Sequence, residues 1–90
     1  MPRYIVQRNL GHVTSEQLDA AARNSKRVRE ERFPDVIWEH SHVVKTKDGL
    51  VTYCVYGGPG EARVREHAKA AGLPADAVWE LVADVDPAKL

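Results

Sequence analysis

Two histidines separated by one residue are the side chains in this sequence best suited to chemistry. His40 and His42 fall in a run of β-branched and aromatic residues that is typical of a strand. Side chains two positions apart on a strand point to the same side, so both imidazoles could bind one metal ion. Such a pair is also typical of half-buried sheet residues that hydrogen-bond to their neighbours. Spacing alone leaves both interpretations open, because no third ligand lies beside the pair.

The remaining candidate side chains are isolated from one another in the sequence. His67 follows Glu66 on an expected helix, but the His-Glu-x-x-His motif of metalloproteases is absent. Without that motif, His67 is typical of a helix-boundary histidine that hydrogen-bonds to a backbone carbonyl. Cys54 lies in mid-strand, where a buried cysteine usually serves as a small hydrophobic residue. The sequence has no paired general acid and base and therefore leans away from an enzyme.

Helix and turn signals predict the elements that position these residues. Thr14 and Gln17 form a capping box at the start of a helix, which should end near Arg32 ahead of Pro34. Asp48-Gly49 predicts a tight turn between two strands. We expect strands over 3–10, 35–47, 50–56 and 77–85, with a second helix that ends at Gly72. The order βαββαβ predicts an α+β, ferredoxin-like fold: a four-stranded antiparallel sheet with two helices on one face.

Alternation along the expected strands sorts their side chains onto two sheet faces. We expect one set to pack under the helices: Ile5, Ile37, Val43, Cys54, Val78 and Val82. We expect the other set on an open face: Tyr4, Val6, Arg8, Trp38, His40, His42, Val44, Val51, Tyr53, Val55, Trp79 and Leu81. An apolar patch of that size exceeds what a soluble monomer usually exposes, which predicts a homodimer through the open face.

Length and composition agree with a small dimeric protein. Ninety residues fit one domain, which we place at 1–85, followed by a tail at 86–90. A domain this short has a thin core, and its single cysteine excludes an internal disulfide, so association would add missing burial. Thirteen basic and thirteen acidic residues balance, which argues against nucleic-acid or membrane partners. The absence of a signal peptide and the lone cysteine predict a cytoplasmic location.

Several stretches spread over nearly the whole chain carry a resemblance to a known family. They are Met1-Pro2-Arg3-Tyr4-Ile5-Val6, the segment from Thr14 to Ala22, Trp38 with Ser41, Tyr53-Cys54-Val55-Tyr56 with Pro59, Val64-Arg65-Glu66-His67-Ala68, Ala71-Gly72-Leu73-Pro74-Ala75, and Glu80. In this order and spacing they resemble the small bacterial proteins of domain of unknown function 4242.

This resemblance implies a ferredoxin-like dimer that binds nickel, and His67 is the residue that best matches the family pattern. The chain departs from that pattern at Gln7, where an acidic residue is usual, and at His42, where an aromatic residue is expected. Losing a carboxylate weakens a hard-ligand site, whereas an added imidazole favours nickel, copper or zinc. The expected metal ligands are therefore His67 from the family pattern, with His40 and His42 as local additions.

Two main functional hypotheses follow. The first is a dimeric metal-binding protein without enzymatic activity, with nickel or another divalent transition metal as its ion. The second is a dimeric αβ-barrel enzyme or binder of small molecules, by analogy of fold. Its ligand cavity would be lined by Tyr4, Arg8, Trp38, Tyr53 and Trp79. A third hypothesis is an accessory domain whose open face meets another protein.

Overall fold

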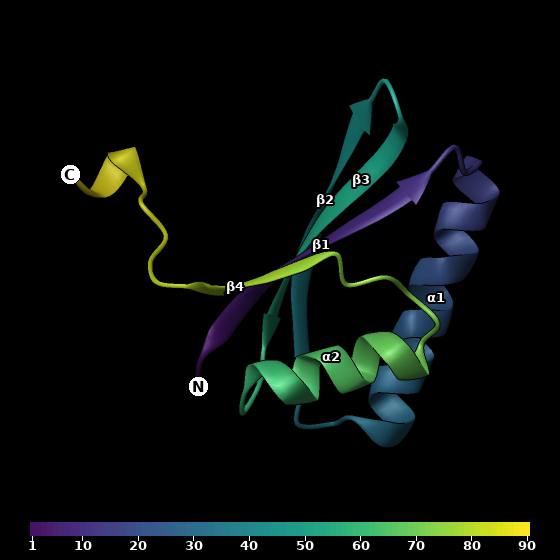
Figure 1. Cartoon of the computed structure of the whole chain (residues 1–90). Helices are drawn as coiled ribbons and strands as arrows, with labels where there is room; N and C mark the ends of the chain where they lie inside the picture. The colour runs from purple at the N-terminus through teal and green to yellow at the C-terminus, as the bar shows by residue number, and fades with distance from the viewer.

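The chain forms one four-stranded antiparallel sheet with both helices on the same side (Figure 1). The computed structural model describes all 90 residues. Neither helix has the length and apolar character needed to cross a membrane. The sheet order β2-β3-β1-β4 and the element order βαββαβ confirm the ferredoxin-like prediction. The elements are β1 (Arg3–Gly11), α1 (Ser15–Arg32), β2 (Ile37–Thr46), β3 (Gly49–Gly57), α2 (Glu61–Ala70), β4 (Ala77–Leu81) and a short 3-10 helix, η1 (Pro87–Lys89).

The local signals at the helix ends act as the sequence predicts. The Thr14 hydroxyl accepts a hydrogen bond from the Gln17 amide at 3.1 Å, and the Gln17 side chain accepts one from the Thr14 amide at 2.8 Å. This capping box satisfies two backbone donors that the first turn of α1 would otherwise leave unpaired. Gly72, after α2, has a φ of +69°, the left-handed conformation expected of a helix terminator.

The β2–β3 hairpin turns earlier than expected. Asp48 keeps a negative φ, and Gly49, with a φ of +109°, already pairs with Thr46 as the first residue of β3. The turn therefore consists of Lys47 and Asp48. The Thr46 hydroxyl closes it by donating to the Gly49 carbonyl at 2.8 Å. From His40 to Thr46 the pairings shift by two positions, an even number, so the side chains in this part of the hairpin stay on their expected faces.

Strand β4 is shorter than expected and ends at Leu81 rather than at residue 85. Leu81 pairs with Arg3, the first residue of β1, so the backbone beyond Leu81 has no neighbouring strand to pair with. The last residues leave the sheet and extend away from the helices (Figure 1).

The expected face of β1 is wrong. Val6 lies opposite Cys54 on β3 and opposite Val78 on β4, and both partners face the helices as expected. Directly paired residues share a face, so Tyr4, Val6 and Arg8 also lie under the helices, where all three are buried. The prediction assumed that the small and β-branched sheet residues pack against the small residues of the helices, and this assumption was wrong for β1. In the structure, the small α1 side chains instead leave room for large ones on the sheet.

A β-bulge in β2 explains why Trp38 is also misplaced by the expected alternation. Trp38 pairs with Tyr56 and His40 pairs with Val55, so Glu39 is the extra residue between them. Trp38 therefore lies on the helix side, whereas His40 keeps its expected place on the open face. The same pairings put Ile5 and Ile37 on the open face, not under the helices as expected.

His67 belongs to the core between the helices and the sheet. Its side chain is 0 % exposed, and its ring lies edge-on to Phe33 and Tyr56, with centroids 5.5 and 5.7 Å away. Its Nε2 lies 3.1 Å from the Ser25 carbonyl oxygen, and this nitrogen must carry the proton because a carbonyl only accepts. The sequence-based interpretation of His67 as a histidine bonded to a backbone carbonyl is thus confirmed. Burial lowers its pKa and keeps the imidazole neutral.

The hairpin glycine gives a stability test. A Cβ on Gly49 would lie 2.1 Å from the Gly11 carbonyl carbon, whereas one on Gly72 would meet no atom within 4 Å. Both glycines have positive φ, so Gly72→Ala should cost about 1 kcal/mol of unfolding free energy from backbone strain alone. Gly49→Ala should cost at least about 3 kcal/mol, because strain adds to a clash with backbone. Urea denaturation measures both, and equal losses would contradict the close approach of Gly49 to Gly11.

The buried His67 predicts how stability depends on pH. Because its pKa is lowered in the folded state, the unfolded chain binds a proton that the folded chain does not. Stability should therefore fall as the pH drops below about 6.5, with a slope of up to about 1.4 kcal/mol per pH unit. His67→Phe, which keeps a ring but cannot titrate, should flatten this slope in urea denaturation between pH 7 and 5. The exposed His12→Ala control should keep it, and an unchanged slope in His67→Phe would contradict the assignment.

Candidate functional site

His40 and His42 form an exposed pair on the open face of the sheet. Both rings project from the edge strand β2, with centroids 5.2 Å apart and planes at 82°. Exposed side chains can rotate at low cost, so a nitrogen from each ring can reach a common ion at about 2 Å. The sequence-based expectation that this pair shares one face is met.

Apolar side chains surround the pair. His40 lies beside Val55 and His42 beside Tyr53 on the neighbouring strand β3. Further along the same face, Ile37 is 46 % exposed, and Trp79 on the opposite edge strand is 51 % exposed. No element of the chain covers this face, because α1 and α2 both lie on the other side (Figure 1).

The chain does not supply a third ligand to the pair. No group of three or more histidine, cysteine or acidic side chains is placed to hold a metal ion. Glu39, next to His40 in the bulge, is already held by Arg3, whose Nε and Nη2 lie 2.7 and 3.0 Å from its carboxylate oxygens. Hydrogen bonds from the Arg3 guanidinium lower the pKa of Glu39. A single chain can therefore supply only two ligands to an ion at this position, the imidazoles of His40 and His42.

His67 does not join His40 and His42. It lies in the core on the helix side, and its Nε2 is occupied by the Ser25 carbonyl. The three histidines expected as ligands therefore do not converge within one chain.

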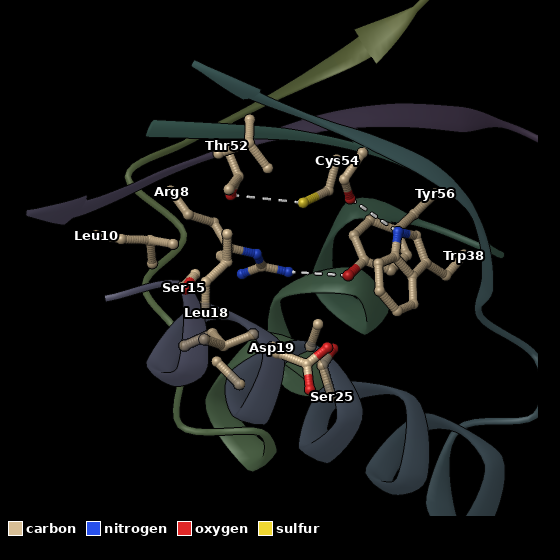
Figure 2. A pocket seen from close by; sticks show the side chains of 15 residues that line it. Arg8, Leu10, Ser15, Leu18, Asp19, Ser25, Trp38, Thr52, Cys54 and Tyr56 are labelled. Atoms are coloured by element: carbon tan, nitrogen blue, oxygen red, sulfur yellow. Dashed lines mark hydrogen bonds between the residues drawn. The ribbon is translucent and has the colours of Figure 1, made fainter. Parts of the chain in front are cut away.

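The expected aromatic cavity on the open face is divided between the two sides of the sheet. Tyr53 and Trp79 lie on the open face, whereas Tyr4, Arg8 and Trp38 lie under the helices. A cavity of about 380 Å³ does exist, but it lies between the sheet and α1 (Figure 2). The sheet contributes Arg8, Trp38, Ser41, Val43, Thr52, Cys54 and Tyr56 to its wall, and α1 contributes Ser15, Leu18, Asp19, Ala21, Ala22 and Ser25; Leu10 and Leu73 complete it.

The sheet side of this cavity combines aromatic surface with one buried charge. Trp38 and Tyr56 stack with ring centroids 6.4 Å apart, and the Trp38 indole donates to the Ser41 hydroxyl at 2.9 Å. Arg8 is 2 % exposed and donates to the Tyr56 hydroxyl at 3.2 Å (Figure 2). Burial raises the pKa of the Tyr56 phenol, so this side chain is neutral and does not balance the arginine.

Cys54, in the same wall, behaves as the sequence predicts. It is buried, and its thiol lies 3.7 Å from the Thr52 hydroxyl (Figure 2). It packs with the core as a small hydrophobic side chain.

Sequence reasoning missed the cavity under α1. Its signal was the run of small residues, Ala21, Ala22 and Ser25, on the inner side of α1. These small side chains form a cavity wall only if the large sheet residues Arg8 and Trp38 lie on the helix side. The face of β1 decides this for Arg8, and the bulge at Glu39 decides it for Trp38.

Comparisons with known proteins agree on fold and family. SCO4226 from Streptomyces coelicolor A3(2), whose crystal structure is known, matches with a TM-score of 0.76 and 23 % sequence identity. The match covers 92 % of this chain and 99 % of that protein, and at this identity it supports the fold alone. No curated protein matches the chain significantly.

A family model described as nickel responsive protein SCO4226-like matches residues 4–81. The expected link to nickel is thus supported only as far as the family is described as nickel responsive. The assignment to domain of unknown function 4242 stays a prediction. Because the family model spans most of the sequence, the chain belongs to the SCO4226-like family of nickel-responsive proteins.

Proposed function

We propose that this protein is a small, dimeric, non-enzymatic metal-binding protein whose ion, nickel, is held by His40 and His42. The observation that carries the proposal is the geometry of the pair: two exposed imidazoles side by side, with centroids 5.2 Å apart. Imidazole nitrogen is a favoured ligand of nickel, copper and zinc. The description of the family as nickel responsive favours nickel among these ions.

The ligand count supports a site completed by a second copy of the chain. Two imidazoles are fewer than the ligands a divalent transition metal normally takes, and the chain places no third one nearby. A two-fold axis that passes beside the pair on the open face would bring a second His40–His42 pair to the first, because residues next to such an axis meet their own copies. One ion per dimer would then have four nitrogen ligands.

The apolar character of the open face supports the same dimer. Ile37, Val44 and Trp79 are each at least 40 % exposed on one continuous sheet face. Burying such side chains against a copy of the same face stabilises a dimer by roughly 25 cal/mol per Å² of apolar surface. The expected homodimer is therefore part of this proposal, as is the cytoplasmic location predicted from the sequence.

A binding role fits the surroundings of the pair better than catalysis. The neighbours of His40 and His42 on β3 are Val55 and Tyr53, and the nearby carboxylate of Glu39 is neutralised by Arg3. This leaves no free acid or base beside an ion to exchange protons with a substrate.

Calorimetric titration of tag-free protein with nickel tests the proposal. Wild-type protein should bind one nickel ion per two chains. His40→Ala and His42→Ala should each weaken binding by more than about 100-fold, beyond the loss typical of an outer-shell partner. The matched control His12→Ala removes an exposed histidine from the loop after β1 and should bind as wild type.

Other results would redirect or end the proposal. One ion per chain, with both variants still defective, would keep the histidine pair but remove the shared site. Unchanged affinity in both variants would exclude the pair as ligands. Retained binding in these variants together with its loss in a folded His67→Ala variant would favour the ligand that the family resemblance implied.

A further inference from the structure

The buried guanidinium of Arg8 has no negative partner within the chain. Arg8 takes part in none of the ion pairs of the protein. Its Nη1 donates to the Pro74 carbonyl at 2.6 Å and its Nη2 to the Tyr56 hydroxyl at 3.2 Å, and both acceptors are neutral. An arginine stays charged at any physiological pH, and an uncompensated charge in a core is costly.

One donor of this guanidinium is unused, and the Arg8 side chain lines the cavity under α1. The Arg8 Nε is buried and has no hydrogen-bond partner. Figure 2 shows the Arg8 side chain reaching from β1 into the space between the sheet and α1. Nε and Nη2 lie on one edge of the guanidinium, and a carboxylate can accept a hydrogen bond from each of them with its two oxygens.

The one acidic side chain at the cavity is engaged elsewhere. Asp19, on α1, accepts from Arg23 Nε at 2.7 Å, and its side chain is 62 % exposed. It therefore lies at the outer margin of the cavity and leaves the inner charge of Arg8 unbalanced.

The rest of the cavity suits an apolar body attached to that anion. Trp38 and Tyr56 offer a stacked aromatic surface, and α1 lines the same cavity with Leu18, Ala21 and Ala22. A volume of about 380 Å³ lies in the range of small-molecule sites, which are mostly apolar with a few placed polar groups. A phosphate would need more donors than the single guanidinium supplies, whereas one carboxylate matches one arginine.

We infer that the cavity under α1 binds a small apolar carboxylic acid, with its carboxylate on Arg8 and its apolar body between Trp38 and α1. This site is independent of the proposed metal site, because Arg8 and His40 lie on opposite faces of the sheet. The two tryptophans separate the faces: Trp38 lines the cavity, and Trp79 lies on the open face.

Nuclear magnetic resonance titration of ¹⁵N-labelled protein, with EDTA present to remove metal, tests this inference. The probe is 4-phenylbutyrate, and its neutral analogue 4-phenylbutanamide is the matched ligand control. We expect 4-phenylbutyrate to shift the Trp38 indole and Arg8 Nε signals, to leave the Trp79 indole unmoved, and to bind at least tenfold more tightly than the amide.

Three variants complete the test. Arg8→Met should lose at least tenfold in affinity for 4-phenylbutyrate, whereas Arg23→Met, which removes the outer arginine, should bind as wild type. Ala22→Leu keeps Arg8 but fills the cavity, and it should also lose binding; circular dichroism verifies that each variant is folded. Equal affinity for acid and amide, shifts at Trp79 instead of Trp38, no binding to wild type, or wild-type affinity in folded Ala22→Leu would each overturn the inference.

Discussion

The pairing of β1 with strands on both sides is the constraint on which the rest of this structure depends. β1 is bonded to β3 along one edge and to β4 along the other, so its alternation decides which side chains of all three strands share a face. With Val6 opposite Cys54 and Val78, the buried set is fixed on the side of the helices. The opposite set, together with His40 and His42 from β2, is left without a cover.

This division gives each side of the sheet a different chemistry. On the helix side, the protein buries Arg8 and His67 among aromatic rings, and the small residues of α1 leave a cavity beside the arginine. On the open side, it exposes two imidazoles among apolar side chains. A ligand on one side need not contact any residue that serves the other, since the sheet itself lies between them.

The sequence was sufficient for features whose cause is local. The capping box at Thr14 and the terminator at Gly72 depend on a few neighbouring residues, and the element order needs only periodicity and turn signals. The shared direction of His40 and His42 followed from strand geometry alone. These features together predict the βαββαβ fold and the histidine pair.

Features that depend on the relation between strands could not be predicted in the same way. The bulge at Glu39 reverses Trp38 relative to His40, and no local signal marks it. The face of β1 follows from its register against β3 and β4, which a single strand does not encode. The cavity depends on both features, because it exists only when Arg8 and Trp38 face the small residues of α1.

We propose that the uncovered sheet face meets its own copy around a nickel ion held by His40 and His42. Anomalous diffraction at the nickel absorption edge, from crystals grown with nickel, would locate the ion. We expect a nickel peak bounded by His40 and His42 on a two-fold axis, with the open faces of two subunits opposed. A peak at other residues, or a histidine pair that faces solvent without metal, would contradict it.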